Sequence, residues 1–347
     1  MYKFRISDII KHPNNNISIR FQDLSGSFPV YKAGQFLTLC FHFGEREVRR
    51  SYSFSSSPDV DEPYEITVKR VDNGEISRLL HHNTIVGDII DVMDPQGLFI
   101  YEPERKTHRT VFLFGAGVGV TPLFSILKTA LVREKESKVV LIYSNSSKES
   151  TLFYNELITW QKKYPDRLKI EFIWSNTKNL LKARLNREYL IDLVNANIEP
   201  DRDTVFYTCG PLFYMDLCRF TLLGMGFPDD RIKKETFHFP EEEEDEDEKE
   251  EEPVDMTDYN IILRFNGQDY PLTIPYNKSV LDVGLEHKLK LPYSCKSGMC
   301  STCVSQVQEG AVRMDYNEIL TDREVANGKC LICTSHPVED GTIIEVL

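Results

Sequence analysis

An acidic run two-thirds of the way along the chain limits how this sequence can fold. Residues 241–252 comprise eleven acidic residues and one lysine, a net charge of −10 within a chain of 347 residues whose total is −13. Charges of one sign repel each other and offer no apolar face to a core. We therefore expect residues 240–257 to be an acidic linker between separately folded parts. A docking site for a basic partner is the alternative.

The rest of the composition is that of an ordinary globular protein. Hydrophobic residues make up 41% of the chain and charged residues 27%, and outside the acidic run the net charge is only −3. Because no cluster of lysine and arginine stands out, we expect no nucleic acid or anionic membrane partner. No apolar stretch reaches the roughly 18 residues of a membrane span, and the first residues lack the apolar core of a signal peptide. These features predict a cytoplasmic protein.

Three patterns of apolar residues indicate three domains. Residues 1–104 hold short β-rich runs at 35–39, 50–54, 64–68 and 88–92 and one helical stretch at 76–82, which predicts an antiparallel β-barrel. In residues 105–239 buried apolar strands alternate with helices, which predicts an α/β domain with a parallel sheet covered on both faces. Residues 258–347 have the size of one small α+β domain, with a hairpin at Asn266-Gly267.

Four cysteines in the last domain carry the strongest signal for a metal. Their order is Cys-x4-Cys-x2-Cys followed by a distant cysteine, the ligand spacing of a plant-type [2Fe–2S] cluster, and they are Cys295, Cys300, Cys303 and Cys333. A zinc site is the alternative. It would use the two Cys-x2-Cys pairs, which include Cys330, and would leave Cys295 without a role.

Two turns of the α/β domain stand where a nucleotide can bind. The turn Gly115-Ala116-Gly117-Val118-Gly119 lies between an expected strand and a helix that starts at Thr121-Pro122, so backbone N–H groups can meet a phosphate there. Its glycine spacing differs from the usual dinucleotide fingerprint. A second turn, Cys209-Gly210-Pro211, ends another strand at the carboxyl edge, where open α/β sheets bind ligands.

These motifs together resemble the ferredoxin–NADP reductase family. Arg50-Ser51-Tyr52-Ser53, Thr67-Val68-Lys69-Arg70 and Gly74-Glu75-Ile76-Ser77 resemble its flavin domain, while the two turns resemble its nicotinamide-nucleotide domain. Nearly the whole chain is similar to the fused reductases of this family, which order a flavin barrel, a nucleotide domain and a β-grasp plant-type ferredoxin domain. The closest resemblance is to the reductase components of phenylacetyl-CoA epoxidases.

The resemblance implies a role for each motif. FAD would be bound by Arg50, Tyr52, Ser53, Val68, Lys69, Gly74, Ile76 and Ser77, with Phe237 as a candidate lid or an ordinary core residue. NADPH or NADH would be bound by Gly115, Gly117, Gly119, Thr121, Ser144, Asn145, Ser175, Arg184, Cys209, Gly210 and Pro211, and Arg184 slightly favours NADPH. Ser53, Thr121 and Cys209 would line the path of the hydride. FAD rather than FMN is favoured by the resemblance and by the helix that begins near Ile76.

The implied function is that of an NAD(P)H-dependent oxidoreductase. Electrons would pass from NAD(P)H through the flavin to the [2Fe–2S] cluster, and from there to a protein acceptor such as the oxygenase component of phenylacetyl-CoA epoxidase. A reductase for a soluble ferredoxin, a flavodoxin or a hybrid-cluster protein is the alternative among enzymes. A non-enzymatic metal-binding or electron-carrier module is the alternative from another class.

Overall fold

The computed structural model describes residues 1–347 except 45, 63, 105–107, 180–181, 200–201 and 238–255. The described chain folds into two compact units, which divide between Phe237 and His238. The expected acidic linker lies outside the described residues except at its last two positions. The predicted domain boundaries after residues 104 and 239 also fall beside residues that are not described, so they stay predictions.

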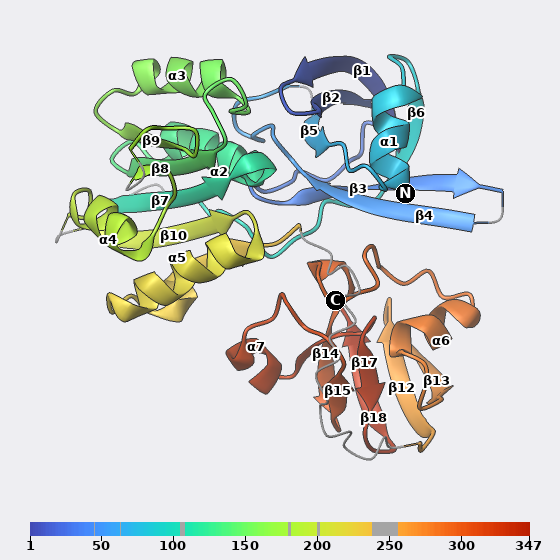
Figure 1. Ribbon diagram of the computed structural model, residues 1–347. Helices are drawn as coiled ribbons and strands as arrows, with labels where there is room; N and C mark the ends of the chain where they lie inside the picture. The colour runs from blue at the N-terminus through green and yellow to red at the C-terminus, as the bar shows by residue number, and fades with distance from the viewer. Residues whose placement is uncertain (45, 63, 105–107, 180–181, 200–201, 238–255) are drawn as a thin grey trace. The chain divides into compact units, whose positions relative to one another are not determined.

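The first part of unit 1 is a six-stranded antiparallel sheet in the order β4-β3-β6-β1-β2-β5 (Figure 1). An isolated bridge from Phe54 to Ile66 joins the segment after β4 to β5, so the two edges of the sheet meet as in the predicted barrel. The barrel encloses its own apolar core. Its elements are β1 (Tyr2–His12), β2 (Asn16–Asp23), β3 (Phe36–Phe43), β4 (Arg46–Ser53), β5 (Tyr64–Lys69), α1 (Glu75–His82) and β6 (Ile89–Val92).

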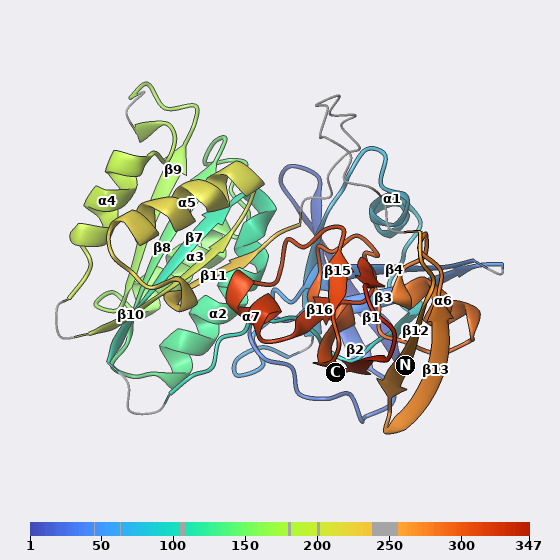
Figure 2. The ribbon, with the colours of Figure 1, turned by 90° about the horizontal axis from the view of Figure 1, so that it is seen from below.

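The second part of unit 1 is a five-stranded parallel sheet in the order β11-β10-β7-β8-β9. Helices cover both faces of it, because α2 and α3 contribute to one apolar cluster and α4 and α5 to another (Figure 2). Its elements are β7 (Arg109–Ala116), η1 (Gly117–Gly119), α2 (Val120–Arg133), β8 (Lys138–Asn145), α3 (Tyr154–Lys163), β9 (Leu168–Trp174), α4 (Arg187–Asn195), β10 (Asp203–Cys209), α5 (Leu212–Gly224), η3 (Asp229–Arg231) and β11 (Ile232–Glu235).

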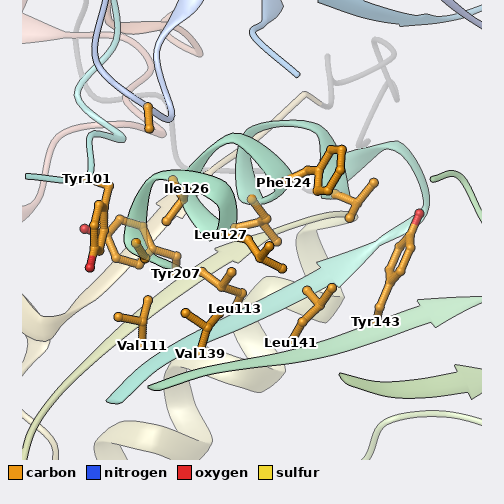
Figure 3. Packing of buried hydrophobic residues seen from close by; sticks show 14 of the residues in the cluster. Tyr101, Val111, Leu113, Phe124, Ile126, Leu127, Val139, Leu141, Tyr143 and Tyr207 are labelled. Atoms are coloured by element: carbon orange, nitrogen blue, oxygen red, sulfur yellow. The ribbon is translucent and has the colours of Figure 1, made fainter. Parts of the chain in front are cut away.

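Helix α2 carries much of the packing on the first face of this sheet. Figure 3 shows Ile126 and Leu127 between the helix and the side chains of the strands, among them Leu113 and Leu141. All of these side chains are at most 1% exposed. Helix α3 begins at Tyr154, because Phe153 adopts a left-handed conformation and Ser147 and Ser150 close a hydrogen-bonded turn before it.

Unit 2 is a five-stranded mixed sheet in the order β13-β12-β18-β14-β16, with a two-stranded ladder of β15 and β17. The predicted hairpin is confirmed: Asn266 and Gly267 both have positive φ, as a two-residue hairpin turn requires. The elements are β12 (Tyr259–Phe265), β13 (Gln268–Ile274), α6 (Val280–Glu286), η4 (Ser301–Cys303), β14 (Val304–Glu309), β15 (Val312–Met314), α7 (Asp322–Ala326), β16 (Lys329–Leu331), β17 (Ser335–Pro337) and β18 (Thr342–Val346).

The predicted fold class is confirmed in all three parts, an antiparallel barrel, a parallel α/β sheet and an α+β domain. Across the residues that the structure describes, no helix is long and apolar enough to cross a bilayer.

Candidate functional site

The nucleotide edge of unit 1 lies where the strand order reverses. Strands β7 and β10 are neighbours in the sheet although about ninety residues separate them in sequence, and open α/β sheets bind ligands at this kind of switch point. The two predicted turns follow these two strands. A Cβ added to Gly119 would lie 2.3 Å from the carbonyl oxygen of Cys209, so only glycine lets the turns approach each other.

The same edge leaves polar backbone open for a ligand. Gly117 has a φ of +56° and no atom within 4 Å of an added Cβ, so open space lies on that side of the turn, while its carbonyl accepts from the Tyr143 hydroxyl at 2.9 Å. Thr121 is buried in the first turn of α2, and its hydroxyl donates to the carbonyl of Val118 at 2.7 Å. That bond fixes the turn and occupies the hydroxyl proton of Thr121. The backbone N–H groups of the turn therefore remain to bind a nucleotide.

Cys209 is fully buried at the end of β10, in register with Gly115 on one side and Glu235 on the other. Burial, with a smaller contribution from Glu235, raises the pKa of its thiol well above the ordinary value. The side chain therefore stays a neutral thiol. A neutral thiol is a poor nucleophile, but it can pack against a flat ring.

Glu235 is the functional residue that the sequence motifs did not single out. The hydroxyl of Ser53 donates to its Oε2 at 2.9 Å, which connects the flavin barrel to the last strand of the nucleotide sheet. Glu235 is 8% exposed, and burial raises the pKa of its carboxyl to about 8 although the bond from Ser53 opposes the shift. One feature of the sequence could have indicated this residue: Glu235 is an acid at the end of a short strand, β11, whose first residue is the apolar Ile232.

Arg50 and Tyr52 occupy alternate positions of β4 and share one face of the strand. The Arg50 guanidinium is exposed and donates to the Arg49 carbonyl at 2.7 Å, so most of its donors remain available to a pyrophosphate. Tyr52 is half-buried, and burial raises the pKa of its hydroxyl. Ser53, one position later, is buried toward Glu235 instead of beside them.

The remaining predicted flavin residues surround the start of α1. Ser77 uses its hydroxyl within the chain, accepting from the Val71 N–H at 3.1 Å and donating to the Gly74 carbonyl at 3.2 Å. Ile76 is 2% exposed and packs in the barrel core, so only its backbone N–H can reach a phosphate. At the end of β5, Val68 is buried and Lys69 is exposed.

The predicted contacts to the far end of the nucleotide lie at the carboxyl ends of β8 and β9. Ser144 Oγ and Asn145 Nδ2 are buried, and the described part of the chain gives neither a hydrogen bond of normal geometry. Orphaned polar atoms are rare in folded proteins, so their position at this edge fits a polar ligand. Ser175 and Arg184 are exposed beyond β9, and Ser175 Oγ donates to the Ser146 carbonyl at 3.4 Å.

Three further predicted positions remain: two belong to the second turn and one follows β11. Gly210 packs against Ala116 and the ring of Tyr214, and Pro211 caps the start of α5. Phe237 is the last residue of unit 1. Its side chain is partly covered and 38% exposed, which is too exposed for a core residue.

In unit 2 the four predicted cysteines converge. The sulfur of Cys295 contacts those of Cys300 and Cys333, and Cys333 also contacts Cys303. Cys330 is fully buried in the unit's apolar core. Among described residues, no three His, Cys, Asp or Glu side chains surround a single ion position. The four sulfurs that converge include Cys295 and leave out Cys330, which fits the two-iron ligand set better than the zinc alternative.

The cluster loop also presents backbone donors to the sulfurs. The Ser297 N–H donates to Cys295 Sγ at 3.4 Å, and the Gly298 N–H points to Cys333. Gly298 has a φ of +71°, and an added Cβ would lie 2.4 Å from the carbonyl oxygen of Tyr316. Such N–H groups stabilise thiolates bound to iron, so the residues present fit a [2Fe–2S] cluster.

Comparison with known families agrees with this division. The oxidoreductase FAD-binding domain family matches residues 15–101, the oxidoreductase NAD-binding domain family matches residues 113–219, and the 2Fe-2S iron-sulfur cluster binding domain family matches residues 263–338.

Several known proteins resemble the chain over most of its length. It is 32% identical over 350 residues to the ferredoxin reductase component of 3-ketosteroid-9-alpha-monooxygenase from Rhodococcus rhodochrous, covering 98% of this chain and 95% of that protein. It is also 32% identical over 319 residues to one subunit of the 1,2-phenylacetyl-CoA epoxidase from Escherichia coli, covering 91% and 88%. The structure of phthalate dioxygenase reductase has the same fold, with a TM-score of 0.59, 23% identity and coverage of 99% and 98%.

Proposed function

We infer that this chain, which belongs to the fused flavin–iron–sulfur reductases of the ferredoxin–NADP reductase family, supplies electrons to an oxygenase component. It is an NAD(P)H-dependent oxidoreductase with FAD-binding, NAD-binding and [2Fe–2S] domains. When bound, FAD takes up a hydride from the nicotinamide and releases the electrons singly to the cluster. Relatives that serve a steroid monooxygenase and a phenylacetyl-CoA epoxidase support an oxygenase as the acceptor.

The observation that carries the proposal is the convergence of both halves of unit 1 on one point. Ser53 of the barrel is hydrogen-bonded to Glu235, Glu235 pairs in register with Cys209, and Cys209 contacts the turn that leads to Thr121. A hydride can pass only between atoms about 3–3.5 Å apart, so residues that frame both rings must be fixed relative to each other.

Each site residue then has a proposed task. Arg50 binds the flavin pyrophosphate and Tyr52 offers its ring to the isoalloxazine. Ser53 offers its hydroxyl to the flavin's reactive edge while Glu235 holds that hydroxyl in place. Cys209 presents an uncharged surface to the nicotinamide. The exposed guanidinium of Arg184 lies beyond β9 and supports NADPH over NADH.

The four cysteines of unit 2 are proposed to hold the cluster, and residues 240–257 to tether it to unit 1. We retain domain bounds of 1–104, 105–239 and 258–347. None of the eight cysteines, all of which lie in the described chain, forms a disulfide, which supports a reducing, cytoplasmic location.

The test is reduction of the purified protein by NADPH, and separately by NADH, under argon. The flavin and cluster absorbance should both bleach, and ferricyanide and cytochrome c should both be reduced with turnover. Replacing Cys300 by serine should remove the cluster absorbance and the cytochrome c activity while ferricyanide reduction continues, because ferricyanide can take electrons from the flavin.

Cys330→Ala is the matched control for this experiment. It removes a buried thiol of the same domain that is not a proposed ligand, so iron content should stay at two per chain. A parent that holds one zinc ion in place of iron, lost in Cys330→Ala and retained in Cys295→Ala, would contradict the assignment and favour the zinc alternative. Failure of both nucleotides to bleach the flavin would overturn the proposed function itself.

A further inference from the structure

Helix α2 of the nucleotide domain is joined to the flavin barrel by a buried lysine. Lys128 is 4% exposed, and its ammonium donates to the Ser55 carbonyl at 2.7 Å and pairs with the Asp61 carboxylate. Burial lowers the pKa of this ammonium, and the charge of Asp61 opposes that shift. We call Lys128, Ser55 and Asp61 the Lys128 clamp.

Two further contacts along α2 also connect this helix to the barrel. The hydroxyls of Ser57 and Thr129 share a buried hydrogen bond of 2.8 Å, and Arg133 pairs with Asp59 at 3.2 Å near the surface. Asp61 also accepts from the Ser57 N–H at 2.7 Å. The barrel loop that contains Ser55, Ser57 and Asp61 therefore has an internal hydrogen bond where α2 contacts it. The loop therefore meets the helix as a rigid element.

The loop is equally well fixed to the barrel behind it. Ser55 Oγ donates to Glu65 Oε1 at 2.8 Å and accepts from Thr67 Oγ1 at 3.0 Å, while the Tyr31 hydroxyl donates to Ser56 Oγ at 2.7 Å. A displacement of α2 at Lys128 would thus be transmitted to β5 and the barrel.

Away from the clamp, apolar packing joins the two domains, because Ala33, Phe99 and Tyr101 of the barrel share one buried cluster with Ile126 of α2. A cavity of about 240 Å³ lies beside the clamp, bounded by barrel residues such as Ile10 and His12, by Phe124 and Lys128 of α2, and by Trp160 of α3. Because the interface is open at this place, the polar contacts of the clamp are what hold the barrel loop against α2 here.

Both partners of the clamp are close in the chain to the site. Ser55 follows Ser53 by two residues, and Lys128 follows Thr121 by two turns of one helix, about 10 Å along its axis. We propose that Lys128 is a positioning residue, which fixes the barrel strand of Ser53 relative to the turn of Thr121 and so sets the geometry in which the flavin and the nicotinamide meet. This inference rests on the proposed function.

The clamp predicts a specific kinetic effect. Lys128→Met keeps an unbranched apolar side chain one atom shorter than lysine and removes both polar contacts. Since a misplacement of about 1 Å can slow an oriented reaction on the order of a hundredfold, flavin reduction at saturating NADPH should slow at least tenfold. The Kd for NADP⁺, measured by difference spectroscopy, should stay within twofold, because the nucleotide contacts are not changed.

The control is Arg133→Met on the same helix. Its ion pair with Asp59 is partly exposed, with 46% of the arginine side chain accessible, so it is expected to contribute little. Flavin reduction in Arg133→Met should stay within twofold of the parent. Equal losses in the two variants would mean that any change to this face slows the reaction, and would overturn a specific role for Lys128.

A second readout measures the geometry without turnover. Ser57→Cys with Thr129→Cys places two thiols where two hydroxyls now share a hydrogen bond, and their disulfide should form readily under oxidised glutathione. Adding Lys128→Met should slow its formation at least tenfold. Once formed, the disulfide should restore flavin reduction in the Lys128→Met chain, because it replaces the lost tether.

The outcomes are separable from those of the proposed function. Parental flavin reduction in Lys128→Met, unchanged disulfide formation, or a slow reaction that persists after the disulfide has formed would each overturn the positioning role. A parent chain that neither NADPH nor NADH reduces would overturn the proposed function, while the disulfide rates would still report whether Lys128 fixes the interface.

Discussion

Replacing Glu235 by glutamine should remove a pH-dependent loss of stability from unit 1. The carboxyl is buried and has a pKa of about 8 in the folded chain, compared with an ordinary value of 4.5. Between these two pH values the folded state binds a proton that the unfolded state has released. The free energy of unfolding therefore falls as the pH rises from 4.5 to 8, and this contribution is constant above about 8.

The magnitude follows from the same two values. At about 1.4 kcal/mol per pH unit, the ionised carboxylate destabilises the fold by roughly 5 kcal/mol above pH 8. Between pH 6 and pH 9, where measurements are practical, the predicted loss is about 2–3 kcal/mol. Glutamine has nearly the same shape, can still accept the Ser53 hydrogen bond, and does not titrate.

The assay is urea unfolding followed by tryptophan fluorescence from pH 5 to pH 9. The chain has only two tryptophans, Trp160 and Trp174, and both belong to the nucleotide domain, so the signal reports unit 1 without unit 2. The stability difference, Glu235→Gln minus parent, should grow with pH. A difference that is constant across this range would refute the argument, as would one that shrinks.

Three further predictions concern other positions of unit 1. Glu134→Gln removes the buried carboxylate from the Arg109 guanidinium, which keeps the Glu102 carbonyl and the exposed Glu104 at 4.0 Å, and it should lower the free energy of unfolding by about 3–5 kcal/mol, measured in the same urea assay; a loss below about 1 kcal/mol would contradict a stabilising buried ion pair. Gly119→Ala should abolish NADP⁺ binding in difference spectra, because its Cβ would meet a carbonyl, whereas Gly224→Ala, whose Cβ has no neighbour closer than 3.8 Å, should bind as the parent does. Arg184→Ala should raise the KM for NADPH about tenfold or more and leave that for NADH within twofold; an equal rise for both nucleotides, or the same effect in Lys182→Ala, would argue against a contact with the 2′-phosphate.

Much of the fold was predictable because its signals are local. The turn Asn266-Gly267 allows positive φ at two successive residues and so specifies a hairpin, and Ser279, a residue type that favours helix starts, accepts a hydrogen bond from the Asp282 N–H at the start of α6. Helix α7 was missed although Thr321 and Glu324 form a capping box, because five residues show no helical period in the sequence.

The site was harder to predict because its key contact is not local. The hydrogen bond from Ser53 to Glu235 joins residues 182 apart, and no spacing in the sequence indicates it. The sequence did not indicate a role for Lys128 for a similar reason. It is one lysine of a largely apolar helix, and its burial depends on a loop about seventy residues earlier in the chain. The convergence of the four cysteines was predictable because three of them lie within nine residues of the sequence.

The order of strands in the parallel sheet has a consequence for the synthesis of the protein. The glycine turn emerges from the ribosome with β7, yet the strand that completes its surroundings, β10, ends at Cys209, and the partner of Ser53 comes only at residue 235. A nascent chain therefore carries an unfinished nucleotide site for about a hundred residues of translation. Premature termination anywhere in that interval would release a fragment with an open sheet edge and no means of holding the nicotinamide.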